Sequence, residues 1–283
     1  MINFPYVALR LFRRLTPAPL AYWLLSNDFR NPFGYLKSAE GYLDAVIEAG
    51  FDLRGRTVVE IGAGSRSPAG LALLMAGAAR VYLQEPFLRP APAALLRERV
   101  QTLFTALRNR PGLIPLSAPL WKDDDLNPEF ARWLEAPADK TPLPDASVDL
   151  FVSTSVLEHI RDIAAVFQEE FRLLKPGGGL LHRVDLRDHI FRWPFEMLTF
   201  SVFVWENILT TPGKGGGYQN RFRIDDYERL LQNTGFTDVR VQTVRSDREG
   251  FERIRKRLPS MYRDRPERTL SATGIVLSAR KHA

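Results

Sequence analysis

Short apolar runs alternate with helical patterns over most of the chain. The runs are rich in Val, Ile, Leu and Phe and are bounded by Gly, Pro, Asp or other polar residues, as buried strands are. They predict strands at 57–61, 80–84, 148–153, 180–185, 237–244 and 274–279. Apolar residues at helical spacing predict helices at 35–49, 69–77, 93–108, 163–174 and 225–233. Strands that take turns with helices indicate an α/β fold with a mostly parallel sheet covered on both faces.

A further, amphipathic helix is predicted ahead of this region. Apolar residues recur at helical spacing between Phe4 and Leu15, while Arg10 and Arg13 lie on another face. The apolar stretch at 20–25 is too short to span a membrane and has no small-residue cleavage site after it, so we expect neither a membrane span nor a secretory signal. We expect the helix to pack on the core or to cover a binding pocket; contact with a membrane surface is the alternative.

Composition narrows the class of protein. The chain has 283 residues, of which 45% are hydrophobic, and this is enough for one α/β core with an additional lobe. It contains no cysteine, which excludes disulfides and thiolate catalysis and fits a reducing cytoplasm. The net charge of +6 is spread along the chain, and no base-reading motif or nucleic-acid-binding domain is recognisable, so we expect no nucleic-acid partner.

The most informative segment is the first strand and the turn after it. An apolar run leads through Glu60 into Gly62-Ala63-Gly64, a turn that exposes backbone amides to a nucleotide-like ligand. Ser67 stands where a dinucleotide turn would place its third glycine. The second strand ends at Glu85, at the spacing of about 20 residues at which an acid grips the hydroxyls of a ribose. The two features together predict a cofactor site.

Two more motifs follow in a recognisable order. The first is the strand Val148–Phe151 continued by Ser155-Val156-Leu157-Glu158-His159-Ile160, and the second is Leu173-Leu174-Lys175-Pro176-Gly177-Gly178. With the glycine turn they resemble the motifs of the class I S-adenosylmethionine-dependent methyltransferases, closely over 55–185 and more loosely afterwards. The resemblance implies a Rossmann-like, mostly parallel sheet of seven strands and S-adenosylmethionine as cofactor.

The resemblance also implies which residues bind the cofactor. The glycines would let the backbone approach its methionine part, where Glu60 would hold the amino group directly or through water. Glu85 would accept the ribose hydroxyls, Asp139 would meet the adenine amino group, and the end of the fourth strand would line the space near the sulfonium. The expected cofactor residues are Glu60, Gly62, Ala63, Gly64, Glu85, Asp139, Ser153 and Ser155.

Candidate catalytic groups gather after the strand at 180–185, where α/β sites form. We expect His189 or His182 to act as a base or to position the acceptor, with Asp185 as an orienting group. A direct pair between residues 182 and 185 is not expected, because they point to opposite faces of a strand. His159 is expected to line the cofactor pocket or pack on a helix. No metal ion is expected, because hard cations require several converging oxygens and only two acids lie here.

An aromatic-rich insertion follows, from 187 to 223, and is expected to form a lid over an acceptor pocket, a helical subdomain or a dimer contact. It ends in a glycine-rich turn at 211–217, after which Asn220, Arg221 and Arg223 are candidates to meet an anionic group of the acceptor. The expected parts are a helical extension or cap at 1–50, the cofactor-binding core at 51–186, the lid at 187–223, and the completion of the core at 224–283.

The sequence therefore predicts a methyltransferase for a small, apolar or aromatic acceptor, acting by O-methylation with deprotonation assisted by histidine. It is expected in the cytoplasm, or peripherally at a membrane through its N-terminal helix, as a monomer or homodimer. The alternatives are N- or C-methylation of a lipid-like or macromolecular acceptor, and a membrane-surface protein that binds the cofactor without turnover.

Overall fold

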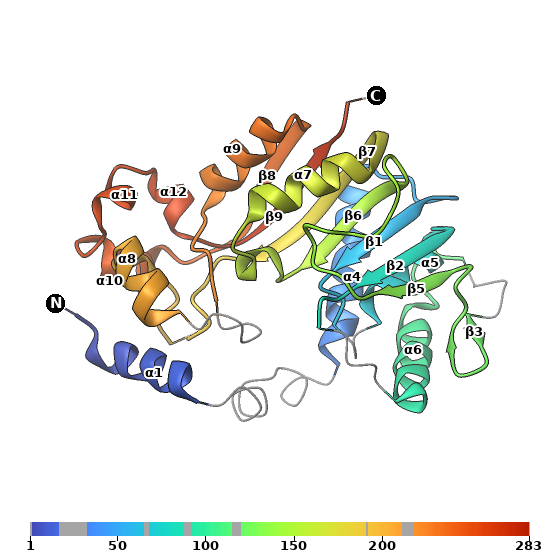
Figure 1. The fold of residues 1–283 in the computed structure, drawn as a ribbon, viewed down its shortest axis with the longest axis horizontal. Coiled ribbons are helices and arrows are strands. Elements are labelled where there is room, and N and C mark those ends of the chain that lie inside the picture. Colours follow the sequence, from blue (N-terminus) through green and yellow to red (C-terminus); the bar gives the residue numbers. More distant parts are fainter. Residues whose placement is uncertain are drawn as a thin grey trace.

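The computed structural model describes residues 2–16, 33–64, 68–87, 92–114, 120–190, 192–210 and 218–282 (Figure 1). The apolar stretch at 20–25 and the glycine-rich turn at 211–217 lie outside the described residues. Among the helices that are described, none has both the length and the apolar character needed to cross a membrane.

Seven strands form one sheet in the order β5-β2-β1-β6-β7-β9-β8. Neighbours from β5 to β7 pair in parallel, and β9 runs antiparallel to both β7 and β8. The strands are β1 (Thr57–Ile61), β2 (Arg80–Gln84), β5 (Ala131–Leu134), β6 (Val148–Thr154), β7 (Leu174–Asp185), β8 (Thr237–Ser246) and β9 (Ala272–Arg280). A separate hairpin joins β3 (Trp121–Lys122) to β4 (Asp125–Leu126). The mostly parallel, Rossmann-like sheet of seven strands is confirmed.

Helices cover both faces of the sheet. Alternate residues of the strands point to opposite faces, so the apolar residues of the inner strands pack against helices on each side. One hydrophobic cluster unites Val58 and Leu150 with α4 (Gly34–Glu48), η1 (Ala69–Leu71), α5 (Ala72–Met75) and α6 (Ala93–Leu107). The other unites Val59 and Phe151 with α7 (Ile163–Leu173) and α9 (Ile224–Thr234). The carboxylate of Asp162 accepts a hydrogen bond from the Ala165 amide and so caps the start of α7.

Within the sheet, β5 and β7 differ most from the sequence prediction, while β6, β8 and β9 differ by one or two residues at their ends. The short edge strand β5 lies within a stretch that carried no strand pattern, and it pairs with β2. β7 begins at Leu174, so the Lys175–Gly179 segment, which has the composition of a turn, is extended. A Cβ on Gly179 would lie 2.5 Å from the carbonyl oxygen of Ala279, so here glycine permits the close approach of β9.

A helical lobe stands beside the sheet, built from three separate stretches of chain. Its hydrophobic cluster includes Tyr6, Trp205, Phe251 and Tyr262. The elements are α1 (Phe4–Leu15), η3 (Glu196–Thr199), α8 (Val202–Val204), η4 (Trp205–Leu209), α10 (Arg248–Arg255), α11 (Ser260–Arg263) and α12 (Glu267–Leu270). In Figure 1, α8, α10 and α11 lie together to the left of the sheet, with α1 below them. The described part of the insertion thus packs with α1 and with the connection between β8 and β9.

Candidate active site

The turn after β1 has the backbone conformation that its glycines allow. Gly62 has φ +67° and Gly64 has φ +65°, both in the left-handed region. Between them, the buried Ala63 donates its amide hydrogen to the carbonyl of Gln84, 3.1 Å away. A Cβ on Gly62 would lie 2.4 Å from Cγ2 of Val156, so the loop that follows β6 packs directly against this turn.

Glu85 lies beside the same turn. Its Oε2 accepts a hydrogen bond from the Gly64 amide at 3.2 Å, and its Oε1 accepts one from the Phe87 amide at 3.2 Å. The side chain is half-buried. A carboxylate at the end of β2 therefore faces the backbone of Gly64, which has no Cβ atom, and this arrangement is suited to a ribose and the group attached to it.

Glu60 lies beneath the turn and is 2% exposed. Its Oε1 accepts a hydrogen bond from the Tyr42 hydroxyl at 2.8 Å, and its Oε2 accepts one from the Gly70 amide at 2.9 Å. Burial raises the pKa of Glu60 to about 8, against the opposing effect of these two hydrogen bonds. A Cβ on Gly70 would lie 2.2 Å from Oε2, which explains the glycine at that position. Both oxygens are thus engaged by α4 and η1.

A third loop lies at the same edge of the sheet, after β5. The buried amide of Gln84 donates hydrogen bonds to the carbonyl of Pro137 at 2.8 Å and to the hydroxyl of Thr141 at 3.0 Å. Asp139 lies between these two anchors and is half-buried. The structure therefore brings the loop of Asp139 to the carboxyl end of the strand that carries Glu85.

Ser153 and His182 are buried inside the core. They pair in register on β6 and β7, and Oγ of Ser153 lies 2.8 Å from Nδ1 of His182. Nε2 of His182 lies 3.1 Å from Oε1 of Glu170 on α7, and all three side chains are fully buried. An acceptor outside the core could not contact His182 in this arrangement. Ser155, by contrast, is exposed at the end of β6 with φ 56°.

Asp185 forms its ion pairs with arginines, and it also interacts electrostatically with His189. Its carboxylate forms an ion pair with Arg187 at 2.6 Å and lies 3.5 Å from the guanidinium of Arg245. Burial favours the neutral acid, but the hydrogen bonds from Arg187 prevail and hold the pKa of Asp185 below its usual range. The absence of a direct pair with residue 182, predicted from strand geometry, agrees with these contacts.

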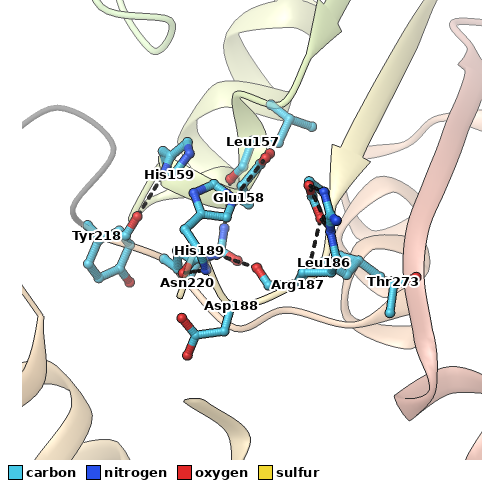
Figure 2. Close-up of polar contacts among 12 residues, drawn as sticks. Leu157, Glu158, His159, Leu186, Arg187, Asp188, His189, Tyr218, Asn220 and Thr273 are labelled. Carbon is cyan, nitrogen blue, oxygen red and sulfur yellow. Dashed lines mark hydrogen bonds and ion pairs between the residues drawn. The ribbon is translucent and has the colours of Figure 1, made fainter. Parts of the chain in front are cut away.

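His189 lies in a cluster that brings together two loops of the chain (Figure 2). Its ring centroid is 4.7 Å from that of His159, and its Nε2 is 4.0 Å from Oε1 of Glu158. Nδ1 of His159 lies 2.7 Å from the carbonyl oxygen of Tyr218. Burial, with a smaller contribution from the neighbouring His159, lowers the pKa of His189 to about 3, so this imidazole is neutral near pH 7. Burial raises the pKa of Glu158 well above its usual range.

The sequence analysis did not single out Glu158, and it assigned His159 to pocket lining. The signal was the Leu157-Glu158-His159 run after β6, which forms the short helix η2 (Leu157–His159). Since this run begins one residue after Val156, the cluster directly adjoins the segment that packs on the glycine turn.

The N-terminal helix anchors the loop of His189. The guanidinium of Arg10 and the hydroxyl of Tyr6 both donate short hydrogen bonds to the carboxylate of Asp188, and all three side chains are buried. Oε1 of Gln219 accepts hydrogen bonds from Arg10 at 3.3 Å and from the His189 amide at 3.0 Å. α1 therefore fixes the segment on which His189 is carried.

Backbone carbonyls accept hydrogen bonds from the side chains of Asn220, Arg221 and Arg223. Asn220 donates to the loop after β6, Arg221 to the insertion, and Arg223 to both the end of β7 and the start of β9. Burial lowers the pKa of Arg223 to about 10. These contacts join the lobe to the core.

Comparisons with known proteins identify the fold. A family model described as a methyltransferase domain matches residues 92–182. A probable S-adenosylmethionine-dependent methyltransferase of Mycolicibacterium smegmatis is 55% identical over 40 residues, which are 14% of this chain and 16% of that protein. The mitochondrial 2-methoxy-6-polyprenyl-1,4-benzoquinol methylase of Caenorhabditis elegans is 26% identical over 130 residues, 44% of this chain and 46% of that protein. The matches thus span less than half the length of either relative.

Two solved structures share the fold at low sequence identity. Phosphoethanolamine N-methyltransferase 2 of Haemonchus contortus, bound to phosphomonomethylethanolamine and S-adenosylhomocysteine, has a TM-score of 0.51 and 18% identity, covering 86% of this chain and 53% of that one. The 1,6-didemethyltoxoflavin-N1-methyltransferase of Burkholderia thailandensis has a TM-score of 0.50 and 16% identity, covering 100% of this chain and 92% of that one. The chain therefore contains a methyltransferase domain, and its fold, sheet order and glycine turn beside Glu85 are like those of the class I S-adenosylmethionine-dependent methyltransferases, whose cofactor is S-adenosylmethionine.

Proposed function

We propose that this chain transfers a methyl group from S-adenosylmethionine to a small-molecule acceptor held between the glycine turn and the cluster of Glu158, His159 and His189. The observation that carries the proposal is the contact between the two: Val156 packs on Gly62, and Glu158 follows two residues later. The cofactor supplies an activated methyl group, so the chain has chiefly to bind and align the two reactants.

The cofactor belongs to the part of the chain at 51–186, with Glu85 on the ribose and Gly62 to Gly64 against the methionine part. The half-buried Glu85 carboxylate beside the Gly64 amide supports this assignment. With both oxygens engaged, Glu60 would act on the amino group through water or by shaping the turn. The acceptor side is formed by α1 and the insertion at 187–223, together with 224–283, which completes the sheet.

O-methylation of an apolar or aromatic acceptor is the proposed reaction. His189 is the sequence-predicted catalytic group that remains within reach of an acceptor, since its side chain is 18% exposed whereas His182 is fully buried. With its lowered pKa the imidazole is a weak base, so it would act chiefly by orienting the acceptor hydroxyl through a hydrogen bond. The name of the Caenorhabditis elegans relative, a polyprenyl benzoquinol methylase, supports an apolar ring as acceptor.

The first test separates cofactor binding from turnover. Calorimetric titration of the purified chain should show binding of S-adenosylmethionine and S-adenosylhomocysteine and much weaker binding of NAD. Acceptor panels of phenols, quinols, primary amines and phosphoethanolamine, with labelled methyl donor, then identify the acceptor atom. Transfer to amines alone would refute O-methylation. His189→Asn should lower kcat on a hydroxyl acceptor at least tenfold and leave cofactor affinity unchanged.

Contact of the N-terminal helix with a lipid surface is a further part of the proposal. Phe4, Phe12 and Leu15 on α1 are 72%, 64% and 81% exposed, and Phe203 on α8 is 70% exposed. Exposed apolar side chains on one helix suit insertion into the interface of a bilayer.

Flotation with vesicles of phosphatidylcholine and phosphatidylglycerol tests this contact. Phe4→Ser with Phe12→Ser should lower the bound fraction several-fold, whereas the matched pair Ile47→Ser with Val244→Ser, which are also exposed, should not. If the wild type does not bind vesicles but forms a dimer, and Phe4→Ser with Phe12→Ser dissociates that dimer, the same face would be assigned to self-association.

A further inference from the structure

The cluster of Glu158, His159 and His189 has the composition of a metal site. One potential ligand atom from each of the three residues lies within 4.8 Å of the others. Nε2 of His189 and Oε1 of Glu158 lie 4.0 Å apart. Two imidazoles with one carboxylate are a ligand set that divalent transition metals favour.

The carboxylate of Glu158 points independently to a bound cation. Glu158 is 3% exposed, and within the described part of the chain neither of its oxygens accepts a hydrogen bond from a side chain. A buried carboxyl group without partners loses its hydration and gains nothing in return, so such groups are rare unless they have a ligand. A cation among these three side chains would give the buried carboxylate a partner of opposite charge.

His159 is oriented as a ligand would be. Its Nδ1 lies 2.7 Å from the carbonyl oxygen of Tyr218, and since a carbonyl only accepts, Nδ1 carries the hydrogen and Nε2 keeps its lone pair. A metal-bound histidine commonly donates its second ring N–H to a backbone carbonyl in this way. Figure 2 shows this contact, and beside it the imidazole of His189 next to that of His159.

The backbone around the cluster is held in place. The His189 amide donates to Oε1 of Gln219 at 3.0 Å, and the neighbouring Asp188 is anchored by the buried Arg10. The side-chain amide of Asn220 donates to the carbonyl of Leu157 at 2.7 Å and so fixes the segment of Glu158. Ligands on two anchored loops lose little entropy when a metal binds.

We propose that Glu158, His159 and His189 bind one divalent transition-metal ion, such as Zn²⁺ or Mn²⁺. Metal–ligand bonds of about 2.0–2.2 Å put neighbouring ligand atoms about 3.0–3.5 Å apart. Binding therefore requires Nε2 of His189 and Oε1 of Glu158, now 4.0 Å apart, to close by about 0.5–1 Å, and ligand atoms up to 4.8 Å apart to close further. Three protein ligands leave coordination positions open for another oxygen. The expectation of no metal considered only the acids after β7, whereas Glu158 comes from the loop after β6.

The metal would also act on the acceptor, a role that rests on the proposed function. An acceptor hydroxyl at an open position would lose its proton more easily, and its oxygen would be fixed next to the segment that packs on Gly62. With His189 bound to the metal, the proton would leave to solvent, and the metal would take over the activating role proposed for His189.

Metal binding is tested on the full chain after chelation and desalting. Calorimetry with ZnCl₂ and with MnCl₂ should show one site per chain with micromolar or tighter affinity. His159→Ala, His189→Ala and Glu158→Gln should each weaken binding at least tenfold. The control His282→Ala removes an exposed histidine near the end of the chain and should leave the affinity unchanged.

A second readout does not depend on activity. Co²⁺ should give a visible absorption band, and this band should be lost in His159→Ala and His189→Ala while their circular dichroism remains that of the wild type. Fewer than one metal per chain, or equal affinity in wild type and His159→Ala, would overturn the site. Methyl transfer that survives chelation in a chain that does bind metal would overturn only the role in activation.

Discussion

Gly62→Ala tests whether glycine is required at position 62 because Val156 packs against it. The substitution adds one methyl group at φ +67°, and this group would meet Cγ2 of Val156 at 2.4 Å and Cγ1 at 2.9 Å. Gly50 offers a matched control, since it has the same φ of +67° and its Cβ would meet nothing within 4 Å. The two alanines share the backbone strain and differ in the clash.

The expected magnitudes follow from that difference. Alanine in the left-handed region costs about 1–2 kcal/mol, which is the whole expected loss for Gly50→Ala. Overpacking adds about 1–3 kcal/mol at Gly62, so Gly62→Ala should lose about 2–5 kcal/mol of unfolding free energy. If the turn moves to relieve the clash, the affinity for S-adenosylhomocysteine should fall by about 10- to 100-fold, at about 1.4 kcal/mol per factor of ten.

Urea denaturation and calorimetry measure the two effects, and Val156→Ala isolates the cause. The side chain of Val156 loses both γ carbons in this variant, so combining it with Gly62→Ala should recover about 1–3 kcal/mol relative to the sum of the single losses. Equal losses in Gly62→Ala and Gly50→Ala, or a strictly additive double variant, would refute the contact as the reason for the glycine.

Three other substitutions have defined outcomes. Burial raises the pKa of Glu60 from 4.5 to about 8, so the folded chain keeps a proton that the unfolded chain releases, and stability should fall by up to about 5 kcal/mol as pH rises through that window. Glu60→Gln should remove most of this pH dependence of the unfolding free energy, measured by urea denaturation at pH 5 and pH 8. An unchanged pH dependence would contradict the raised pKa of Glu60. Arg10→Met removes the cation that pairs with the buried Asp188, so the unfolding free energy measured in urea should fall by about 3–5 kcal/mol. Adding Asp188→Asn removes the buried charge and should restore most of this loss. Glu85→Ala should weaken S-adenosylhomocysteine binding about tenfold or more by calorimetry, and wild-type affinity would remove this acid from the cofactor site.

Two inner strands, β1 and β2, could be predicted to the residue, whereas the edge strand β5 could not. β1 and β2 lie between helices on both faces, so each is an apolar run with sharp ends. β5 is four residues long, and within it Arg132 is exposed and Trp133 only half-buried. Its pairing with β2 depends on backbone hydrogen bonds such as that from Val81 to Phe130, for which the sequence carries no pattern.

The candidate catalytic residues show a second limit. Strand periodicity correctly separates residues 182 and 185 onto opposite faces, but periodicity alone cannot say which face is covered by a helix. α7 covers the face of His182 and supplies Glu170, and the register with β6 supplies Ser153. His189 lies past the end of the strand, where its direction depends on loop contacts with distant residues.

The N-terminal helix is predicted at the correct residues, but the face that it buries is the opposite of the one expected. Its amphipathic spacing predicts a helix at the residues where one forms, and the usual inference buries the apolar side. Here Tyr6 and Arg10 are buried on Asp188, while Phe4, Phe12 and Leu15 face outward. The inversion arises because the buried carboxylate beside His189 requires a cation, and Arg10 supplies it. The helix therefore packs its polar face on the loop of His189, while its apolar side chains Phe4, Phe12 and Leu15 remain exposed.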